Sequence, residues 1–297
     1  MGTHTFGGDW TEDKLERVRK YLVAYTKIFK RNPRAQYYTT VYVDAFAGTG
    51  EREGSRKGRT KTRELALQIT DDQDAQELRK GSARIALEVR PPFDSFLFIE
   101  QNAKRIKELE KLRTEFSDQA SGIRIEPGDA NEVLKRWCRD SDWQKQRAVV
   151  FLDPYGMQVE WSTIEAIAGT QAIDLWVLFP LGMAVNRLLT RKQPPPKPWA
   201  EALTRFFGTE EWRDQFYPKK KERLLFEEEE SERKAANFKQ ISDYFLKRLK
   251  SVFAEVAPKP LVLENSNGVP IYLLCFAAGN PKGAPTAVRI AKDILKR

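Results

Sequence analysis

The stretch Thr39–Gly50, TTVYVDAFAGTG, decides the fold. Its β-branched and aromatic run, Thr39–Val43, predicts a buried strand that ends at Asp44. A turn containing Gly48 and Gly50 follows. Glycines permit positive φ angles and let backbone N–H groups approach a ligand, and a carboxylate at the strand end accepts hydrogen bonds from amines or hydroxyls. A strand, an acidic residue and then glycines are typical of a nucleotide-binding loop in an open α/β sheet. The same residues also form ordinary turns between elements.

Four further apolar runs predict the neighbouring strands. They are Ser95–Ile99, Ile123–Ile125, Ala148–Leu152 and Ile173–Phe179. Helical segments separate the runs, which predicts a parallel sheet with right-handed crossovers. Glu100, Asp129 and Asp153 follow the first three runs, and ligands gather at the carboxyl ends of such strands. Glu100 could therefore accept from both hydroxyls of a ribose and Asp129 from an adenine amino group, although Asp129 could equally be only the N-cap of a helix over 131–138.

Apolar residues at helical spacing predict a long helix over Asp9–Arg31, with Asp9 as the candidate N-cap. This helix could simply pack on the sheet, or its first residues could form a flap over the ligand. Further helices are expected over 82–89, where Ser82 is the candidate N-cap, and over 103–116, 163–168 and 285–295.

Two segments interrupt the alternation of strands and helices. Residues 51–80 are polar and include five arginines, which predicts a solvated insertion, with a substrate-contacting loop as the alternative. A charged helical insertion is expected over about 188–255, where the runs KKKER (219–223) and EEEE (227–230) are typical of solvated helix faces. Leu261–Leu263 and Ile271–Ala277 then predict a closing β-hairpin. The chain, 1–297, is expected to be a single domain carrying both insertions.

The composition narrows the class of protein. The 297 residues are 41% hydrophobic, enough for a large core, and no apolar run reaches the roughly 18 residues of a membrane span. The N-terminus lacks the features of a secretory signal, so a cytoplasmic location is expected. Two cysteines and one histidine make structural zinc improbable. The net charge of +9 fits a polyanionic partner such as nucleic acid, but 42 acidic residues beside 51 basic ones also fit an ordinary charged surface.

Taken together, the motifs resemble those of class I S-adenosylmethionine (SAM) dependent methyltransferases. DAFAGTG, residues 44–50, resembles the D-x-F-x-G-x-G loop that holds the methionine end of SAM. The resemblance implies a Rossmann-like α/β fold, with a mostly parallel sheet, a C-terminal antiparallel hairpin strand and helices on both faces. It also implies a site of two parts. The cofactor-binding residues would be Asp44, Phe46, Gly48, Gly50, Glu100, Asp129 and Ala130, and the catalytic residues Asp153, Pro154 and Tyr155.

Four segments of the chain resemble, more narrowly, those of the bacterial three-Cys-motif partner proteins (TcmP). The segments are FGGDWTEDKLERVRKYL (6–22), DAFAGTG (44–50), FLDPYGMQVEW (151–161) and LWVLFPLGMAVNRLL (175–189). The group is named for a neighbouring gene, so a complex with the three-Cys-motif protein is one implied partnership. Asp44 and Glu100 stand 56 positions apart rather than the usual about 20, which requires an insertion between them.

Two classes of function follow. DPYG, residues 153–156, is similar to the DP[FY]G of tRNA N2,N2-dimethylguanosine methyltransferases and differs from the DPPY of amino-group DNA methyltransferases. The first hypothesis is therefore SAM-dependent methylation of an exocyclic amino group of a nucleic-acid base. The alternative is a methyltransferase-like binding or specificity partner of a neighbouring enzyme, and a small-molecule or protein methyltransferase also fits the motifs.

Overall fold

A central sheet of eight strands organises the chain in the computed structural model, which describes residues 10–47, 73–154, 156–218, 220–223, 228–231 and 233–296. Its order is β3-β2-β1-β4-β5-β10-β8, and β9 also pairs with β10. The bounds are β1 Thr39–Asp44, β2 Ser95–Glu100, β3 Ile123–Pro127, β4 Gln146–Leu152, β5 Ile173–Phe179, β8 Glu255–Val256, β9 Leu261–Glu264 and β10 Pro270–Ala278.

Strands β1 to β5 run parallel, whereas β10 lies antiparallel to β5, β8 and β9. This mostly parallel sheet with a late antiparallel strand is the methyltransferase-like arrangement expected from the motifs. Each predicted strand segment lies within its strand. The runs of β1, β2, β4 and β5 are buried almost throughout, which suits strands that helices cover on both faces, whereas β3 is an edge strand with one fully buried residue. The prediction of the closing hairpin, β9 and β10, is also confirmed.

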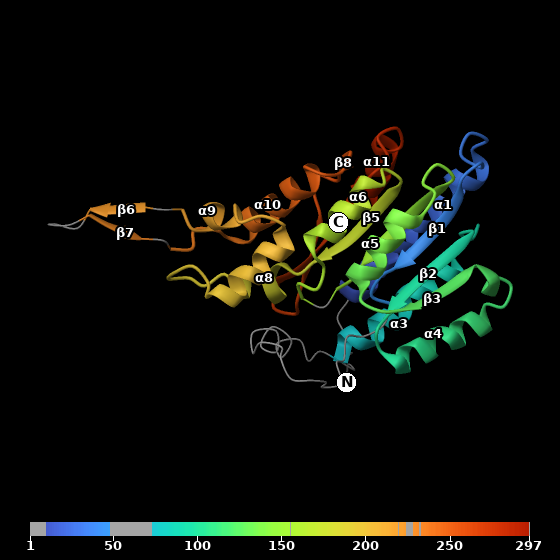
Figure 1. Ribbon diagram of the computed structural model, residues 1–297, viewed down its shortest axis with the longest axis horizontal. Coiled ribbons are helices and arrows are strands. Elements are labelled where there is room, and N and C mark those ends of the chain that lie inside the picture. The colour runs from blue at the N-terminus through green and yellow to red at the C-terminus, as the bar shows by residue number, and fades with distance from the viewer. Residues whose placement is uncertain are drawn as a thin grey trace, which may run out of the picture.

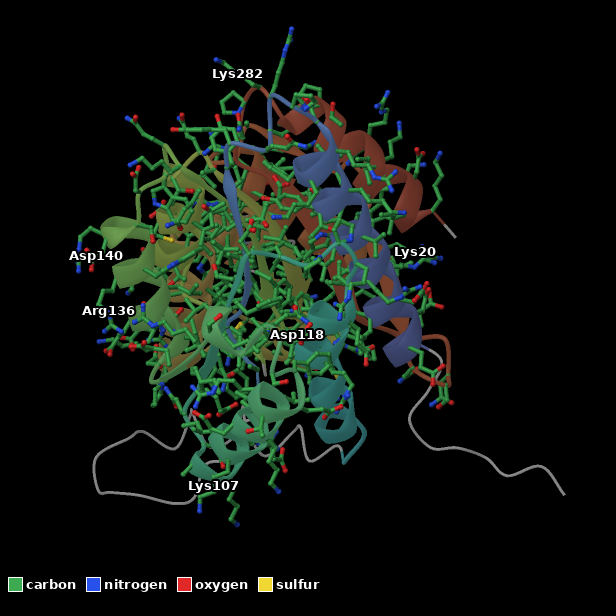
Figure 2. The ribbon with its side chains drawn as sticks, turned by 90° about the vertical axis from the view of Figure 1, so that its right-hand side faces the viewer. Lys20, Lys107, Asp118, Arg136, Asp140 and Lys282 are labelled. Carbon is green, nitrogen blue, oxygen red and sulfur yellow. The ribbon has the colours of Figure 1, made fainter. Side chains whose placement is uncertain are left out.

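Helices cover both faces of the sheet (Figures 1 and 2). On one face lie α1 Trp10–Arg31, α3 Gln73–Glu88, α4 Ala103–Glu115 and α11 Ala284–Leu295. On the other lie α5 Ala130–Asp140, α6 Trp161–Gly169, α8 Lys197–Phe207, α9 Trp212–Phe216 and α10 Phe238–Lys250. Figure 2 shows the two layers on either side of the strands, with Lys20 on α1 and Arg136 on α5. Among the described residues, no helix is both long enough and apolar enough to span a membrane.

The alternation of side chains along each strand divides the core in two. In β4, for example, Val150 and Leu152 pack with α5 and α6, whereas Val149 and Phe151 pack with α1. On the α1 face, Tyr21 meets Trp176 of β5 and Phe276 of β10 with ring centroids 5.4 and 4.8 Å apart. These aromatic contacts fix α1 across the sheet.

The region between β5 and β8 differs from its prediction. The two charged runs do not form helix faces: β6 Lys220–Arg223 and β7 Glu228–Ser231 pair as an antiparallel hairpin. The register pairs Lys221 with Glu230, Glu222 with Glu229 and Arg223 with Glu228 along the backbone. In Figure 1 this hairpin forms one end of the molecule, far from the sheet.

A second correction concerns Ser82, which is no N-cap. It lies well inside α3, which begins nine positions earlier at Gln73. The expected short helix around 63–69 falls outside the described residues.

A turn of π-helix, η2 Leu181–Val185, follows β5 and leads into the short α7 Asn186–Leu188. Gly182 makes this path possible, because a Cβ there would lie 2.1 Å from the carbonyl oxygen of Pro270 in β10. The close approach fixes η2 beside β10 and so fixes where the chain leaves β5. Single π-helical turns occur frequently at functional sites.

Candidate functional site

Three carboxylates share one face and one edge of the sheet. Asp44 closes β1, Glu100 closes β2 and Asp153 follows β4. Each stands two positions after a residue packed on the α1 face, namely Tyr42, Phe98 and Phe151, so strand alternation directs all three acids to that face. All three are buried, with exposed fractions of 0, 7 and 5%. A buried acid needs partners, and each of these acids has them.

Asp44 is held by α3 and by its own turn. Ser82 Oγ donates to Asp44 Oδ2 at 2.6 Å, and the N–H of Phe46 donates to Oδ1 at 3.3 Å. Ser82 therefore binds Asp44 from inside α3 instead of capping the start of a helix. The side chain of Phe46 is partly buried against the core on the α5 face. Gly48 and Gly50 lie outside the described residues.

Glu100 is oriented by the backbone that follows it. Its Oε1 accepts from the N–H groups of Gln101 and Asn102, each at 2.7 Å. Asn102 in turn caps α4 by accepting from Lys104 N at 2.9 Å. The two backbone N–H groups therefore hold the Glu100 carboxyl group in one orientation at the end of β2.

Asp129 is the N-cap of α5, which is one of the two roles that the sequence left open. Its Oδ1 accepts from the N–H groups of Asn131 and Glu132 and caps α5, and its Oδ2 accepts from Gln101 Nε2 at 3.1 Å. A contact with an adenine amino group stays a prediction. Ala130, the first residue of α5, is buried in the core on the α5 face.

Asp153 is paired with a residue that the sequence analysis did not single out. Lys14 Nζ, from the second turn of α1, donates to Asp153 Oδ2 at 2.7 Å, 139 positions away in the chain. Lys14 is 1% exposed, and its ammonium lies 5.9 Å from the ring centroid of Phe151. A signal was present, since Lys14 shares the helical face of Val18, Tyr21 and Tyr25. A lysine in an apolar stripe implies a buried anion.

The loop after Asp153 is tied down from two sides. Asn131 Nδ2 donates to the carbonyl of Gln158 at 3.0 Å, and Asn131 Oδ1 accepts from Glu160 N at 2.9 Å. Gly156 lies next to η2, where an added Cβ would stand 3.8 Å from that of Ala184. Pro154 is buried, and Tyr155 lies outside the described residues. The candidate catalytic segment is thus held between α5 and η2.

Tyr42 lies under the same carboxylates. Burial, reinforced by the charges of Asp44 and Asp153, raises the pKa of its phenol well above the usual value. Its hydroxyl is buried and has no hydrogen-bond partner in the described part of the chain. The phenol therefore stays protonated beside the two acids.

A cavity of about 430 Å³ lies between α3 and α4, next to Ala47 of the β1 turn. Its floor is apolar, with Ala83, Leu109 and Leu112, and charged side chains of the two helices surround it. None of the four strand-end acids lines this cavity. The cavity and the acidic cluster are therefore separate features.

Two comparisons with known proteins gave no match: no family model matches the chain, and neither does any curated protein. Among solved structures, the chain is similar to protein LPL1258 of Legionella pneumophila str. Philadelphia 1 (family-model DUF519), with a TM-score of 0.49, 12% identity and coverage of 98% of this chain and 92% of that one. A conserved hypothetical protein of Streptococcus pyogenes gives a TM-score of 0.30 at 15% identity, over 52% of this chain and 76% of that one. The methyltransferase domain of bacterial CtHen1-CN gives 0.30 at 12% identity, over 88% and 98%. At such TM-scores the methyltransferase-like fold rests on the strand order and on the antiparallel β10.

Proposed function

We propose that this chain is a SAM-dependent methyltransferase of the three-Cys-motif partner type, acting on an exocyclic amino group of a nucleic-acid base. The observation that carries the proposal is the state of Asp153. One carboxylate oxygen is held by Lys14, and the other, Oδ1, accepts no hydrogen bond from any described residue. A buried carboxylate at the end of β4 thus keeps an acceptor for a ligand.

The strand-end acids suit SAM in chemical type. SAM offers hydrogen-bond donors at its ribose hydroxyls, its adenine amino group and its ammonium group, and ionised carboxylates are acceptors only. Glu100 would take the ribose hydroxyls, Asp129 the adenine amino group and the turn after Asp44 the methionine end. Bound SAM supplies a methyl group activated by its positive sulfur.

The acceptor chemistry falls to residues 153–155. An exocyclic amine conjugates its lone pair into the base and is a weak nucleophile. Asp153 Oδ1 and the carbonyl of Pro154 would accept its hydrogens and return electron density to the nitrogen. Tyr155 would stack on the base, a contact worth about 1–3 kcal/mol. A base in a duplex would first have to be flipped out.

The substrate class rests on charge. The net charge of +9 favours a polyanion, and a flat amine between a carboxylate and an aromatic ring fits a base. Calorimetry with SAM and its demethylated product tests the cofactor, and we expect dissociation constants in the micromolar range. Incubation with labelled SAM and separate DNA, RNA, protein and small-molecule pools tests the substrate. Label in the protein or small-molecule pool alone would contradict the base assignment.

The β6–β7 hairpin favours a second candidate, a binding or specificity partner of the neighbouring three-Cys-motif protein. Its strands pair only with each other, and an isolated two-stranded hairpin is marginally stable in water. A partner that pairs with its edge would stabilise it. Calorimetry of the two proteins, with a variant in which a short turn replaces residues 220–231, tests this. Binding that survives the replacement would exclude the hairpin as the contact.

A further inference from the structure

Lys14 is a buried charge at a place where the fold does not require one. It is the only lysine among the buried side chains of the described residues. It stands on the α1 face that carries Val18, Tyr21 and Leu22, all of which pack in an apolar core. An apolar residue at this position would continue that packing, so helix formation and core burial do not explain the lysine.

Stability does not explain it either. Removing two charges from water costs about as much as their attraction returns, and replacing a buried ion pair with apolar residues is often neutral or stabilising. What a buried pair does provide is a fixed geometry, because each partner left alone would be an uncompensated charge. The 2.7 Å contact between Lys14 Nζ and Asp153 Oδ2 is of this kind.

The contact makes the two carboxylate oxygens of Asp153 different. Oδ2 is taken by the ammonium, while Oδ1 accepts from no described residue. On the adjacent strand, Asp44 is held by Ser82, and the charges of Asp44 and Asp153 both act on the buried Tyr42 phenol. Lys14 thus provides the cation for a buried group of acids and determines which Asp153 oxygen remains for a ligand.

We propose that Lys14 is a positioning residue for methyl transfer. It holds Asp153 through Oδ2 so that Oδ1 accepts a hydrogen of the acceptor amine, and this makes α1 part of the acceptor site. The inference rests on the proposed function, since it concerns the same Asp153. It adds a residue from a helix that precedes every strand of the sheet.

The test compares Lys14→Met with Lys20→Met, the same substitution two turns along α1 at an exposed lysine. Transfer from tritiated SAM to total RNA, and in parallel to total DNA, gives kcat and KM for the nucleic acid, and calorimetry gives the SAM affinity. We expect Lys14→Met to lower kcat by about 100-fold, as a displaced catalytic group does, with the SAM affinity unchanged. Lys20→Met should behave as the parent.

A second comparison separates positioning from folding. If Lys14 acts through Asp153, the Lys14→Met/Asp153→Asn double variant is no slower than Asp153→Asn alone. Lys14→Arg keeps the charge but moves the donor, so it should fold and recover part of the lost kcat. Far-UV circular dichroism and melting curves accompany every variant, and if Lys14→Met does not fold, Lys14→Arg and the double variant decide.

The outcomes are distinct. Transfer by Lys14→Met equal to that of Lys20→Met, faster transfer, or losses that add in the double variant would overturn the positioning role alone. A parent protein that binds no SAM and labels neither nucleic acid would overturn the proposed function, and this inference with it.

Discussion

Lys14 near the start of α1 and Tyr21 in its middle meet two acids in different ways. At the carboxyl edge of the sheet, Lys14 pairs with Asp153 at 2.7 Å. At the opposite edge, the Tyr21 hydroxyl donates to Asp174 Oδ2, also at 2.7 Å. An ammonium supplies a full charge, whereas a phenol supplies one hydrogen bond, and burial raises the pKa of Asp174 to about 7. The same helix therefore gives one acid a cation at the carboxyl edge of the sheet and gives the other only a hydroxyl at the far edge.

The comparison extends to the neighbouring residues. At the far edge, Lys30 pairs with Asp94, which also accepts from the N–H and hydroxyl of Thr40. These contacts join α1 to the start of β1 and to the segment that precedes β2. At the carboxyl edge, Asp153 binds Lys14 through Oδ2, and its Oδ1 accepts from no described residue. Substitutions at either edge should accordingly change stability, whereas only those at the carboxyl edge should change ligand binding.

The largest effect is expected from removing one member of the Lys14–Asp153 pair. Asp153→Ala removes the carboxylate from the buried Lys14 ammonium and should lower the free energy of unfolding by about 3–5 kcal/mol. Urea unfolding measures it. The Lys14→Met/Asp153→Leu double variant should recover most of the loss, and a double variant as unstable as the single one would show that the pair is not what Asp153→Ala breaks.

The next effect concerns the cofactor. Glu100→Ala removes a charge-assisted acceptor and should weaken SAM binding by about 1.5–3 kcal/mol in calorimetry. Asp174→Asn is the matched control at the other edge, and it should bind SAM as the parent does. Equal affinities for the parent and Glu100→Ala would remove Glu100 from the cofactor site.

Asp174 itself should make stability depend on pH. The unfolded chain releases this proton near the usual pKa of 3.8, whereas the folded protein keeps it up to about 7. Between these values the native state binds more protons, so its stability falls as the pH rises through this window. Asp174→Asn should remove that fall and gain about 1–2 kcal/mol at pH 8, the partly exposed side chain keeping the gain small. Parallel parent and variant stability curves from pH 4 to pH 8 would contradict this.

The smallest effect tests the two roles of Asp129. Asp129→Ala removes the cap of α5 and should cost about 1 kcal/mol of stability, whereas Asp129→Asn keeps a capping oxygen and should cost little. The asparagine variant thus isolates the charge. Weaker SAM binding by Asp129→Asn would support the contact with adenine, and unchanged binding would leave Asp129 as a helix cap alone.

Local patterns were sufficient for the strands and for the places of the acids. Val41, Val43 and their counterparts in the other apolar runs form the buried strands that periodicity predicted, because a strand covered on both faces needs apolar residues at consecutive positions. Asp44, Glu100 and Asp153 stand at the strand ends where the sequence put them. The hairpin of residues 220–231 was missed, because alternate charges and a high content of Lys and Glu suit a helix as well as a ribbon.

Hydrophobic periodicity and turn residues close in the chain are enough to predict the sheet, the long helix α1 and the order of the strand-end acids. The partners of those acids are not predictable in this way. Lys14 and Asp153 are 139 positions apart, and Ser82 reaches Asp44 from the interior of a helix expected to begin there. Such pairs depend on how α1 and α3 lie across the strands. That geometry arises from tertiary packing, of Tyr21 on Trp176 and Phe276 for α1 and of Ala83, Ala86 and Leu87 in the same core for α3, and no local pattern predicts it.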